Sequence, residues 1–156
     1  MKKFYHVDVT SQIKDNYIFE SKVEMDLKNL GKYKLSLHGE RYLVGVNKDS
    51  FYELMYEVVR RNYYPHRISR LESLFAFETI EEAIKFAREY RNDYKCNILE
   101  VTSEEYEIFD MNYLSGGSGE DIYNKCLKYW EGELTLNPIR ECLLKLPVRV
   151  HKIYRL

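Results

Sequence analysis

Three separated stretches of the chain hold side chains that could take part in one reaction. They are Phe4-Tyr5-His6, the run Ser69–Phe77 (Ser-Arg-Leu-Glu-Ser-Leu-Phe-Ala-Phe) and the run Glu141–Pro147 (Glu-Cys-Leu-Leu-Lys-Leu-Pro). Together they contain an imidazole, a guanidinium, a carboxylate and aromatic rings. A carboxylate in a low-dielectric cleft can stabilise a developing positive charge, and an imidazole can hold a hydroxyl group in position.

Common signatures for nucleotides, metals and covalent catalysis are absent. The sequence has no Gly-x-Gly-x-x-Gly, no Gly-Lys-Ser/Thr phosphate loop, no His-Glu-x-x-His and no Gly-x-Ser-x-Gly. Ser115–Gly119 is rich in glycine but lacks the lysine and the strand–loop–helix context of a phosphate loop, so we expect a plain loop. The three cysteines Cys96, Cys126 and Cys142 lack metal-type spacing, which predicts buried free thiols and no metal site.

The order and spacing of the three stretches resemble the ADP-ribosyltransferase superfamily. In that superfamily a Tyr-His pair on the first strand holds the ribose of NAD, and a middle strand with Ser or Tyr runs into a helix beside the nicotinamide. The catalytic glutamate opens a late strand, commonly Glu-x-Leu-Leu followed by Pro. The resemblance implies NAD as the substrate and Glu141 as the catalytic residue. Cleavage of the nicotinamide–ribose bond passes through an oxocarbenium-like state, which a carboxylate can stabilise.

The resemblance also implies roles for residues around NAD. His6 would donate to a ribose hydroxyl, and Tyr5 or Tyr129 would complete a ring sandwich on the nicotinamide. Phe75 stands where the superfamily has a stacking tyrosine, but it lacks the hydroxyl, so Ser73 could instead match the serine of other subgroups. Each residue also has a structural alternative: a satisfied strand histidine, or aromatic side chains of a core strand.

Four arginines within eleven residues surround Pro65, namely Arg60, Arg61, Arg67 and Arg70. Because guanidinium groups bind phosphate bidentately, they could contact the NAD pyrophosphate or a phosphorylated acceptor. We favour Arg70, which lies beside the Ser73 strand; the alternative is a solvated helix end. Glu131 and Glu133, near the single Trp130, are rival carboxylates to Glu141, and His38 is expected in a loop.

The whole chain, from Phe4 to Ile153, is also similar to an uncharacterised bacterial family, a domain of unknown function. Its members share the Ser-Arg…Ser-Leu-Phe-Ala-Phe run, a Tyr-Trp-x-Gly element and the Glu-x-Leu-Leu ending. The step from that family to NAD chemistry depends on the three short motifs alone.

Periodicity predicts the elements that position these residues. Helices are expected at 50–62, 79–90 and 119–130, with capping boxes at Ser50/Glu53 and Thr79/Glu82. Strands are expected at 3–9, 73–77, 96–101, 106–110, 141–144 and 148–154, while Tyr33–Leu37 and Tyr42–Val46 could be strands or loop. The irregular alternation favours a single α+β domain over residues 1–156, with a split, mostly antiparallel sheet and a cleft between its halves.

Composition limits the partners and the cellular location that we expect for this chain. With 24 basic and 25 acidic residues the net charge is −1, so we expect no stable nucleic-acid complex. We expect a cytoplasmic protein without a membrane span or signal peptide. The leading hypothesis is transfer of ADP-ribose from NAD to an unidentified acceptor, by a toxin, an antiphage effector or a modifier of small molecules. The alternatives are a non-enzymatic module that binds a nucleotide or a partner, and a purely structural protein.

Overall fold

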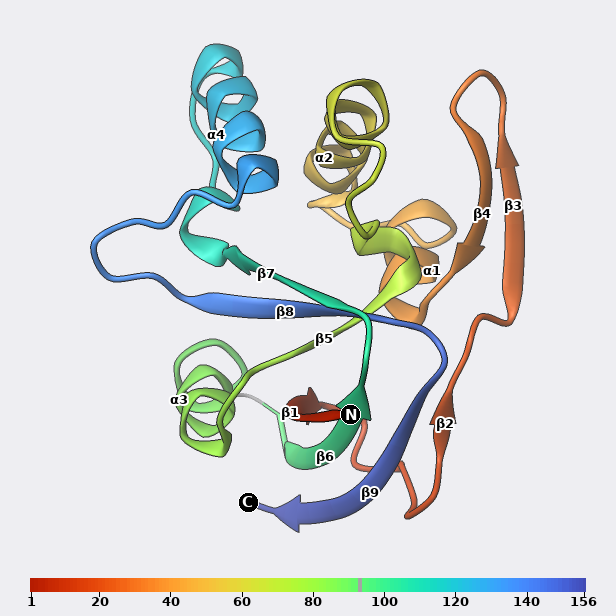
Figure 1. Ribbon diagram of the computed structural model, residues 1–156, viewed down its shortest axis with the longest axis vertical. Helices are drawn as coiled ribbons and strands as arrows, with labels where there is room; N and C mark the ends of the chain where they lie inside the picture. Colours follow the sequence, from red (N-terminus) through yellow and green to blue (C-terminus); the bar gives the residue numbers. More distant parts are fainter. Residues whose placement is uncertain (93) are drawn as a thin grey trace.

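The structure, a computed structural model, describes residues 1–92 and 94–156 (Figure 1). In this part of the chain four α-helices combine with antiparallel sheets, so the fold is α+β. The strands are β1 (Lys2–Asp8), β2 (Ile18–Phe19), β3 (Val23–Leu27), β4 (Gly31–Leu35), β5 (Ser73–Ala76), β6 (Asn97–Ser103), β7 (Tyr106–Asp110), β8 (Arg140–Lys145) and β9 (Val148–Arg155). The helices are α1 (Leu37–Leu43), α2 (Ser50–Tyr63), α3 (Ile80–Tyr90) and α4 (Gly119–Glu131), with short 3-10 helices η1 (Arg70–Glu72) and η2 (Met111–Tyr113).

Two larger sheets meet at one point. The first, in the order β1-β6-β9-β2, is curled into a half-barrel, and a β-bulge between Glu100 and Val101 adds to its twist. The second has the order β5-β8-β7, and β3 and β4 form a separate hairpin. An isolated antiparallel bridge joins Tyr5 to Phe77, with two backbone hydrogen bonds of 2.9 Å. In Figure 1, α2 and α4 lie on one side of the β5-β8-β7 sheet and α3 on the other.

The alternation of side chains along β8 serves two cores. Cys142 and Leu144 pack with Phe4 of β1 in the core between the sheets, whereas Leu143 packs beneath α2 and α4. Residues two apart on a strand share a face, so Glu141 points to the same side as Leu143. The catalytic candidate therefore faces the helices.

Most of the expected elements are confirmed. The strands expected at 3–9, 73–77, 96–101, 106–110, 141–144 and 148–154 correspond to β1, β5, β6, β7, β8 and β9, and the three expected helices to α2, α3 and α4. The Thr79/Glu82 capping box is present, and all three cysteines are free and buried.

The expectation of a loop at His38 is wrong, and so is that of a strand or loop at Tyr42 and Leu43, whereas residues 44–46 do lie in a loop. Both His38 and Tyr42 belong to α1, whose N-cap Ser36 accepts a hydrogen bond from the backbone N–H of Gly39 over 3.2 Å. A Cβ atom at Gly39 would lie 2.1 Å from the carbonyl oxygen of Leu71. The helix thus depends on a close approach to η1, a long-range contact that local periodicity does not reveal.

The capping box expected at Ser50/Glu53 is also wrong. The N-cap of α2 is Asp49, which makes no side-chain cap bond, and Glu53 pairs with an arginine instead. The buried face of α2 is partly polar: Phe51 is 64% exposed, whereas Glu57 and Arg60 are buried. Their mutual ion pair, with Nη2–Oε1 at 2.6 Å, compensates that burial.

The two capping-box patterns give a test of the helix starts. Thr79→Ala is expected to lower the free energy of unfolding by about 1 kcal/mol, because the cap hydrogen bond to the Glu82 backbone N–H is lost. Ser50→Ala is expected to change it by less than about 0.5 kcal/mol, since no described residue bonds the Ser50 hydroxyl. Urea unfolding followed by circular dichroism measures both, and equal losses would contradict the assignment.

Candidate functional site

A buried guanidinium joins four elements of the fold. Arg70 begins η1, directly before β5, and only 5% of its side chain is exposed. Its partners are Glu53 on α2, Tyr129 on α4 and Glu141 on β8. Because these partners lie 17, 59 and 71 residues away in sequence, the contact ties distant parts of the chain together.

The donors of Arg70 are matched to oxygen acceptors on two sides. Its Nε and Nη2 each lie 3.0 Å from a carboxylate oxygen of Glu53, which is a bidentate pair. Its Nη1 donates to the Tyr129 hydroxyl over 2.7 Å and also to Oε1 of Glu141. The Tyr129 hydroxyl in turn donates to the same Oε1 over 2.6 Å. We call Glu53, Arg70, Tyr129 and Glu141 the Arg70 network.

Ionisation in the network follows from burial and charge. Burial disfavours the charge on Arg70, but Glu141 and Glu53 outweigh it and raise the pKa of Arg70 well above its usual range. Burial likewise opposes ionisation of Glu53, yet Arg70 and His38 hold the pKa of Glu53 well below its usual range. Burial raises the pKa of the Tyr129 phenol, so it stays a hydrogen-bond donor. At neutral pH Glu53 and Arg70 are therefore a charged pair, and Tyr129 keeps its proton.

Aromatic rings enclose the guanidinium. Its Cζ lies 4.7 Å from the centroid of the Phe75 ring and 5.4 Å from that of Tyr129, within cation–π range. The His38 ring packs edge-on against Phe75 at 4.2 Å. Its Nε2 lies 3.1 Å from Oε1 of Glu53, although the N–H direction does not form an aligned hydrogen bond. Burial lowers the pKa of His38, so the imidazole is neutral at pH 7.

The two oxygens of Glu141 differ. Oε1 accepts from both Arg70 and Tyr129. Oε2 has no hydrogen-bond partner among the described residues, and it is not one of their fully enclosed polar atoms. The carboxylate is therefore fixed through one oxygen and keeps the other available for a ligand hydroxyl.

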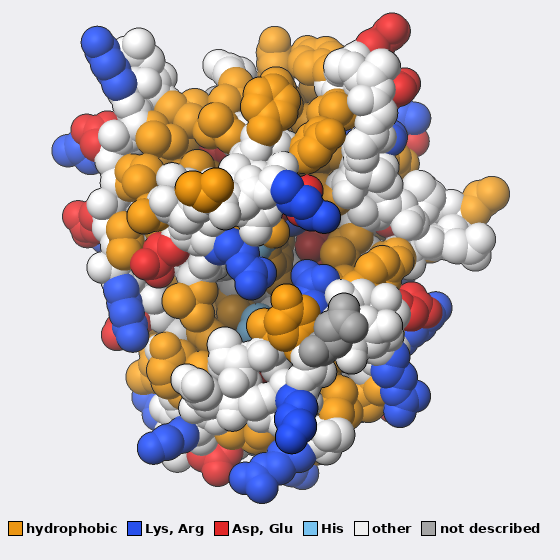
Figure 2. Space-filling view, turned by 180° about the vertical axis from the view of Figure 1, so that it is seen from behind, with side chains coloured by type: hydrophobic (Ala, Val, Ile, Leu, Met, Phe, Trp, Pro, Cys, Tyr) orange, Lys and Arg blue, Asp and Glu red, His pale blue; other side chains and the backbone are white. Residues whose placement is uncertain are grey.

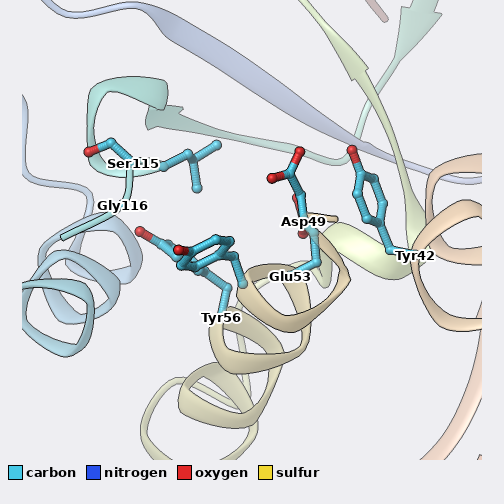
Figure 3. A pocket seen from close by; sticks show the side chains of 8 residues that line it. Tyr42, Asp49, Glu53, Tyr56, Ser115 and Gly116 are labelled. Atoms are coloured by element: carbon cyan, nitrogen blue, oxygen red, sulfur yellow. The ribbon is translucent and has the colours of Figure 1, made fainter. Parts of the chain in front are cut away.

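A small pocket opens against Glu53, between α1, the start of α2 and the loop after η2 (Figure 3). It has a volume of about 190 Å³ and is lined by Tyr42, Asp49, Tyr52, Glu53, Tyr56, Leu114, Ser115 and Gly116. Figure 3 shows Tyr42 and Tyr56 on opposite sides of the two carboxylates. Pockets that enclose drug-sized ligands measure roughly 300–1,000 Å³, so this one fits a single ring or side chain.

A larger cavity, of about 340 Å³, lies between α3 and the segment that leads into β8. Phe77, Phe86 and Tyr90 line it, and the last two rings stack with centroids 5.1 Å apart. Arg140 also lines it; this exposed side chain forms no ion pair or side-chain hydrogen bond with any described residue. The cavity thus combines stacking surfaces with an available cation, next to Glu141 in the chain.

The structure brings together only some of the sequence candidates. Arg70, Phe75, Tyr129 and Glu141 are in one place, as described above. Ser73 shares a face of β5 with Phe75, and its buried hydroxyl has no hydrogen-bond partner among the described residues.

Tyr5 and His6 lie on β1, away from these contacts. His6 Nδ1 is 2.6 Å from the Phe75 carbonyl oxygen, and its ring meets Phe19. The ring is on the face of β1 that holds Phe4, in the core between the sheets. Tyr5 packs on the other face, in the cluster that contains Phe77. Burial lowers the pKa of His6, so it is a neutral core histidine in this structure.

The remaining arginines and rival carboxylates have structural partners. Arg60 bonds Glu57 and two backbone carbonyls, Arg61 donates to the Leu30 carbonyl, and Arg67 pairs with Glu107. Among the rivals, Glu131 accepts from Tyr64, and Glu133 lies 3.9 Å from Lys128 in a half-exposed pair.

Sequence reasoning missed Glu53 and His38. Glu53 was read as part of a capping box, and His38 as loop. Glutamate at the fourth position of a helix supports either interpretation, and a single sequence does not show which one wins. The sequence held no signal for the pair of Glu53 with Arg70, because a guanidinium requires carboxylate partners only where it is buried, and the burial of Arg70 is known from the structure alone.

Comparison with known families agrees with the whole-chain resemblance. A family model described as a protein of unknown function (DUF2441) matches residues 2–155. The chain belongs to the DUF2441 family. No curated protein matches this DUF2441 sequence. Within the described residues of this DUF2441 chain, no helix has the length and apolar character to span a bilayer. No group of three or more His, Cys, Asp or Glu side chains among them is arranged to hold a metal ion.

Removing the guanidinium tests how much the Arg70 network contributes. Arg70→Met is expected to lower the free energy of unfolding at pH 7 by about 3–5 kcal/mol, because it leaves two buried carboxylates without their cation. Lys145→Met, which breaks an exposed pair with Glu105, is expected to cost less than about 1 kcal/mol. Urea unfolding of both variants gives the comparison.

The pH dependence supplies a second readout for the same variant. In the native protein the pKa of Glu53 is lower than in the unfolded chain, where it is about 4.3. The resulting stabilisation is fully present at pH values above about 4.3 and is lost as pH falls through the folded pKa. Without Arg70, burial raises the pKa of Glu53, and protonation of this carboxylate reduces the loss of stability in the variant. The deficit of Arg70→Met should therefore shrink between pH 7 and pH 5, and a constant deficit would contradict the ionic role.

Proposed function

We propose that this chain is an NAD-dependent ADP-ribosyltransferase in which Glu141 is the catalytic residue. The observation that carries the proposal is the state of its carboxylate. Arg70 and Tyr129 hold Oε1, while Oε2 has no partner among the described residues. A charge that is fixed before the substrate arrives needs no reorganisation during the reaction, which is the most effective form of electrostatic catalysis.

The proposed step is a substitution at the C1′ carbon of the ribose. The bond from C1′ to the nicotinamide nitrogen breaks, and its electron pair leaves with the now neutral nicotinamide. Oε2 of Glu141 accepts a hydrogen bond from a ribose hydroxyl and stabilises the positive charge that develops on the ring. An atom of the acceptor forms the new bond to C1′ and loses its proton to solvent. Arg70 acts through Glu141 and is a positioning residue.

Two features of the fold support this reaction class. The two antiparallel sheets that meet at Tyr5 and Phe77 fit the split sheet that the resemblance implies. Glu141 stands at the beginning of β8, where the superfamily has its catalytic glutamate. The role of Arg70 differs from the one expected from the sequence. Its N–H donors bind the carboxylates of Glu53 and Glu141, so we do not propose it as a ligand of the pyrophosphate.

Instead, we place the base and diphosphate of the dinucleotide over the larger cavity. Because this cavity lies on the α3 side of the β5-β8-β7 sheet while Glu141 faces α2 and α4, the nicotinamide end would have to pass the beginning of β8 to reach Glu141. The stacked rings of Phe86 and Tyr90 suit a planar base, and Arg140 suits the diphosphate. Tyr5 borders this region through Phe77, in keeping with its proposed cofactor role. Figure 2 shows Lys and Arg side chains gathered around a hollow near the middle of one face, which favours an anionic substrate.

One observation favours a second candidate, a binding module without catalysis. The side chain of Glu141 is only 4% exposed and already forms an ion pair. His6, the other residue of the proposed motif, lies on the face of β1 that holds Phe4, in the core between the sheets. In that case the same surface would bind NAD or a related nucleotide but would not turn it over.

Nicotinamide release distinguishes the candidates. The native protein is incubated with NAD, alone and with cell lysate as a source of acceptor, and free nicotinamide is measured. Glu141→Gln is expected to reduce release by about 10²–10³-fold, because the amide keeps the shape but not the charge. Glu133→Gln, a half-exposed rival, is expected to leave the rate unchanged.

Controls separate loss of chemistry from loss of fold. Both variants should give native circular dichroism spectra and cooperative thermal unfolding. A thermal shift with NAD but no release would support the binding module. Release that is unaffected by Glu141→Gln would overturn the assigned residue, and neither shift nor release would overturn both candidates.

The placement of the dinucleotide has its own test. Arg140→Ala is expected to raise the KM for NAD about tenfold or more with little change in kcat, because a charge-assisted contact to phosphate is lost. Arg88→Ala removes an exposed arginine of α3 outside the cavity and should leave KM unchanged. Equal effects of the two substitutions would indicate general electrostatics only.

A further inference from the structure

The pocket against Glu53 is a separate feature from the larger cavity. Its volume of about 190 Å³ is too small for a dinucleotide, but it is built from side chains of two helices and closed by the loop at Leu114–Gly116. It meets the Arg70 network only at Glu53. A ligand in this pocket would therefore be a small group or the end of a larger molecule.

The charge around the pocket is negative. Asp49 and Glu53 provide two carboxylates of the lining; Arg70, which is not a lining residue, pairs with Glu53, and Asp49 has no such cation among the described residues. His38 adds no charge, since burial lowers its pKa. None of the described lining residues is Lys or Arg; Arg41, the neighbour of Tyr42 in sequence, is exposed.

Two hydrogen-bonding groups of the lining are available to a ligand. Asp49 is the N-cap of α2, yet its carboxylate makes no cap bond and has no side-chain partner among the described residues. The phenol of Tyr42 is half-buried, and burial is the main cause that raises its pKa; Glu53 and Asp49 add to this, whereas Arg41 and Arg70 act against it.

Three phenol rings complete the lining, from Tyr42, Tyr52 and Tyr56. The hydroxyl of Tyr56 is occupied by the Tyr113 carbonyl, so its contribution is the ring. Aromatic faces attract cations, and carboxylates bind guanidinium and ammonium groups through charge-assisted hydrogen bonds. A phosphate in the same place would be repelled by two carboxylates.

The geometry points to an organic cation, a guanidinium or primary ammonium group on a short apolar stem, as the ligand of the pocket at Tyr42, Asp49, Tyr52 and Glu53. Its head would lie between the Asp49 and Glu53 carboxylates, with the stem against the rings. Binding needs no NAD, so the inference goes beyond the proposed transfer and stands or falls separately from it.

Two probes of equal shape test the charge requirement on the full-length chain. Butylguanidinium is expected to bind saturably, with a Kd on the order of 1 mM or tighter. Butylurea, its neutral counterpart, is expected to bind at least tenfold more weakly. Amide chemical shifts in heteronuclear NMR report both affinity and place, and the largest shifts are expected around Tyr42, Asp49, Tyr52 and Gly116.

Matched substitutions locate the site. Asp49→Asn is expected to weaken butylguanidinium binding about tenfold, and Tyr42→Phe to weaken it less. Asp26→Asn removes the same charge from an exposed position on β3 and should leave the affinity unchanged. Each variant is first shown to retain the native amide spectrum outside the substituted residue. The inference is overturned by equal affinity for the two probes, by shifts that map elsewhere, by no saturable shift, or by equal effects of Asp49→Asn and Asp26→Asn.

A third probe identifies the source of the cation. A blocked Gly-Arg-Gly peptide carries the same guanidinium on a polypeptide backbone. Tighter binding than that of butylguanidinium assigns the pocket to a protein side chain, and weaker binding assigns it to a free small amine or guanidine. All three titrations are carried out without NAD, so their outcome is independent of nicotinamide release.

Discussion

A single buried guanidinium organises this protein. Transfer of an arginine side chain from water to a protein interior is costly, and the cost is offset only when acidic partners satisfy its donors. Arg70 meets that requirement with Glu53 on one side and Glu141 with Tyr129 on the other. The first carboxylate comes from a helix and the second from a strand, so their pairing fixes α2 and α4 against the β5-β8-β7 sheet.

This arrangement has a direct consequence for chemistry. The carboxylate of Glu141 is buried and held through one oxygen by Arg70 and Tyr129, yet its other oxygen remains unpaired among the described residues. Such a carboxylate either is preorganised to stabilise a transition state or serves only in a structural ion pair. The position of Glu141 at the start of a strand, with one carboxylate oxygen unpaired among the described residues, favours the first interpretation.

The sequence predicted what depends on local pattern. The capping box at Thr79 identified α3, alternation identified β1, and the apolar run identified β5. Arg70, Phe75, Tyr129 and Glu141 were named as candidates, and they do meet. Their mutual roles could not be predicted, because the partners of Arg70 are distant along the chain and Glu53 fits a capping pattern equally well. The face of β1 on which His6 lies depends on how the sheets stack, which alternation alone does not determine.

The boundary between the two sheets differs from their interiors in its resistance to sliding. Within each sheet, ladders of hydrogen bonds resist sliding. Between β1 and β5, by contrast, the described residues form two backbone bonds, at Tyr5 and Phe77, and one contact from His6 Nδ1 to the Phe75 carbonyl oxygen. Elsewhere the interface is apolar packing, which has no preferred direction and tolerates small shear displacements. Because few directional bonds cross this boundary, a small shear between the two sheets is expected to cost less than a distortion within either of them.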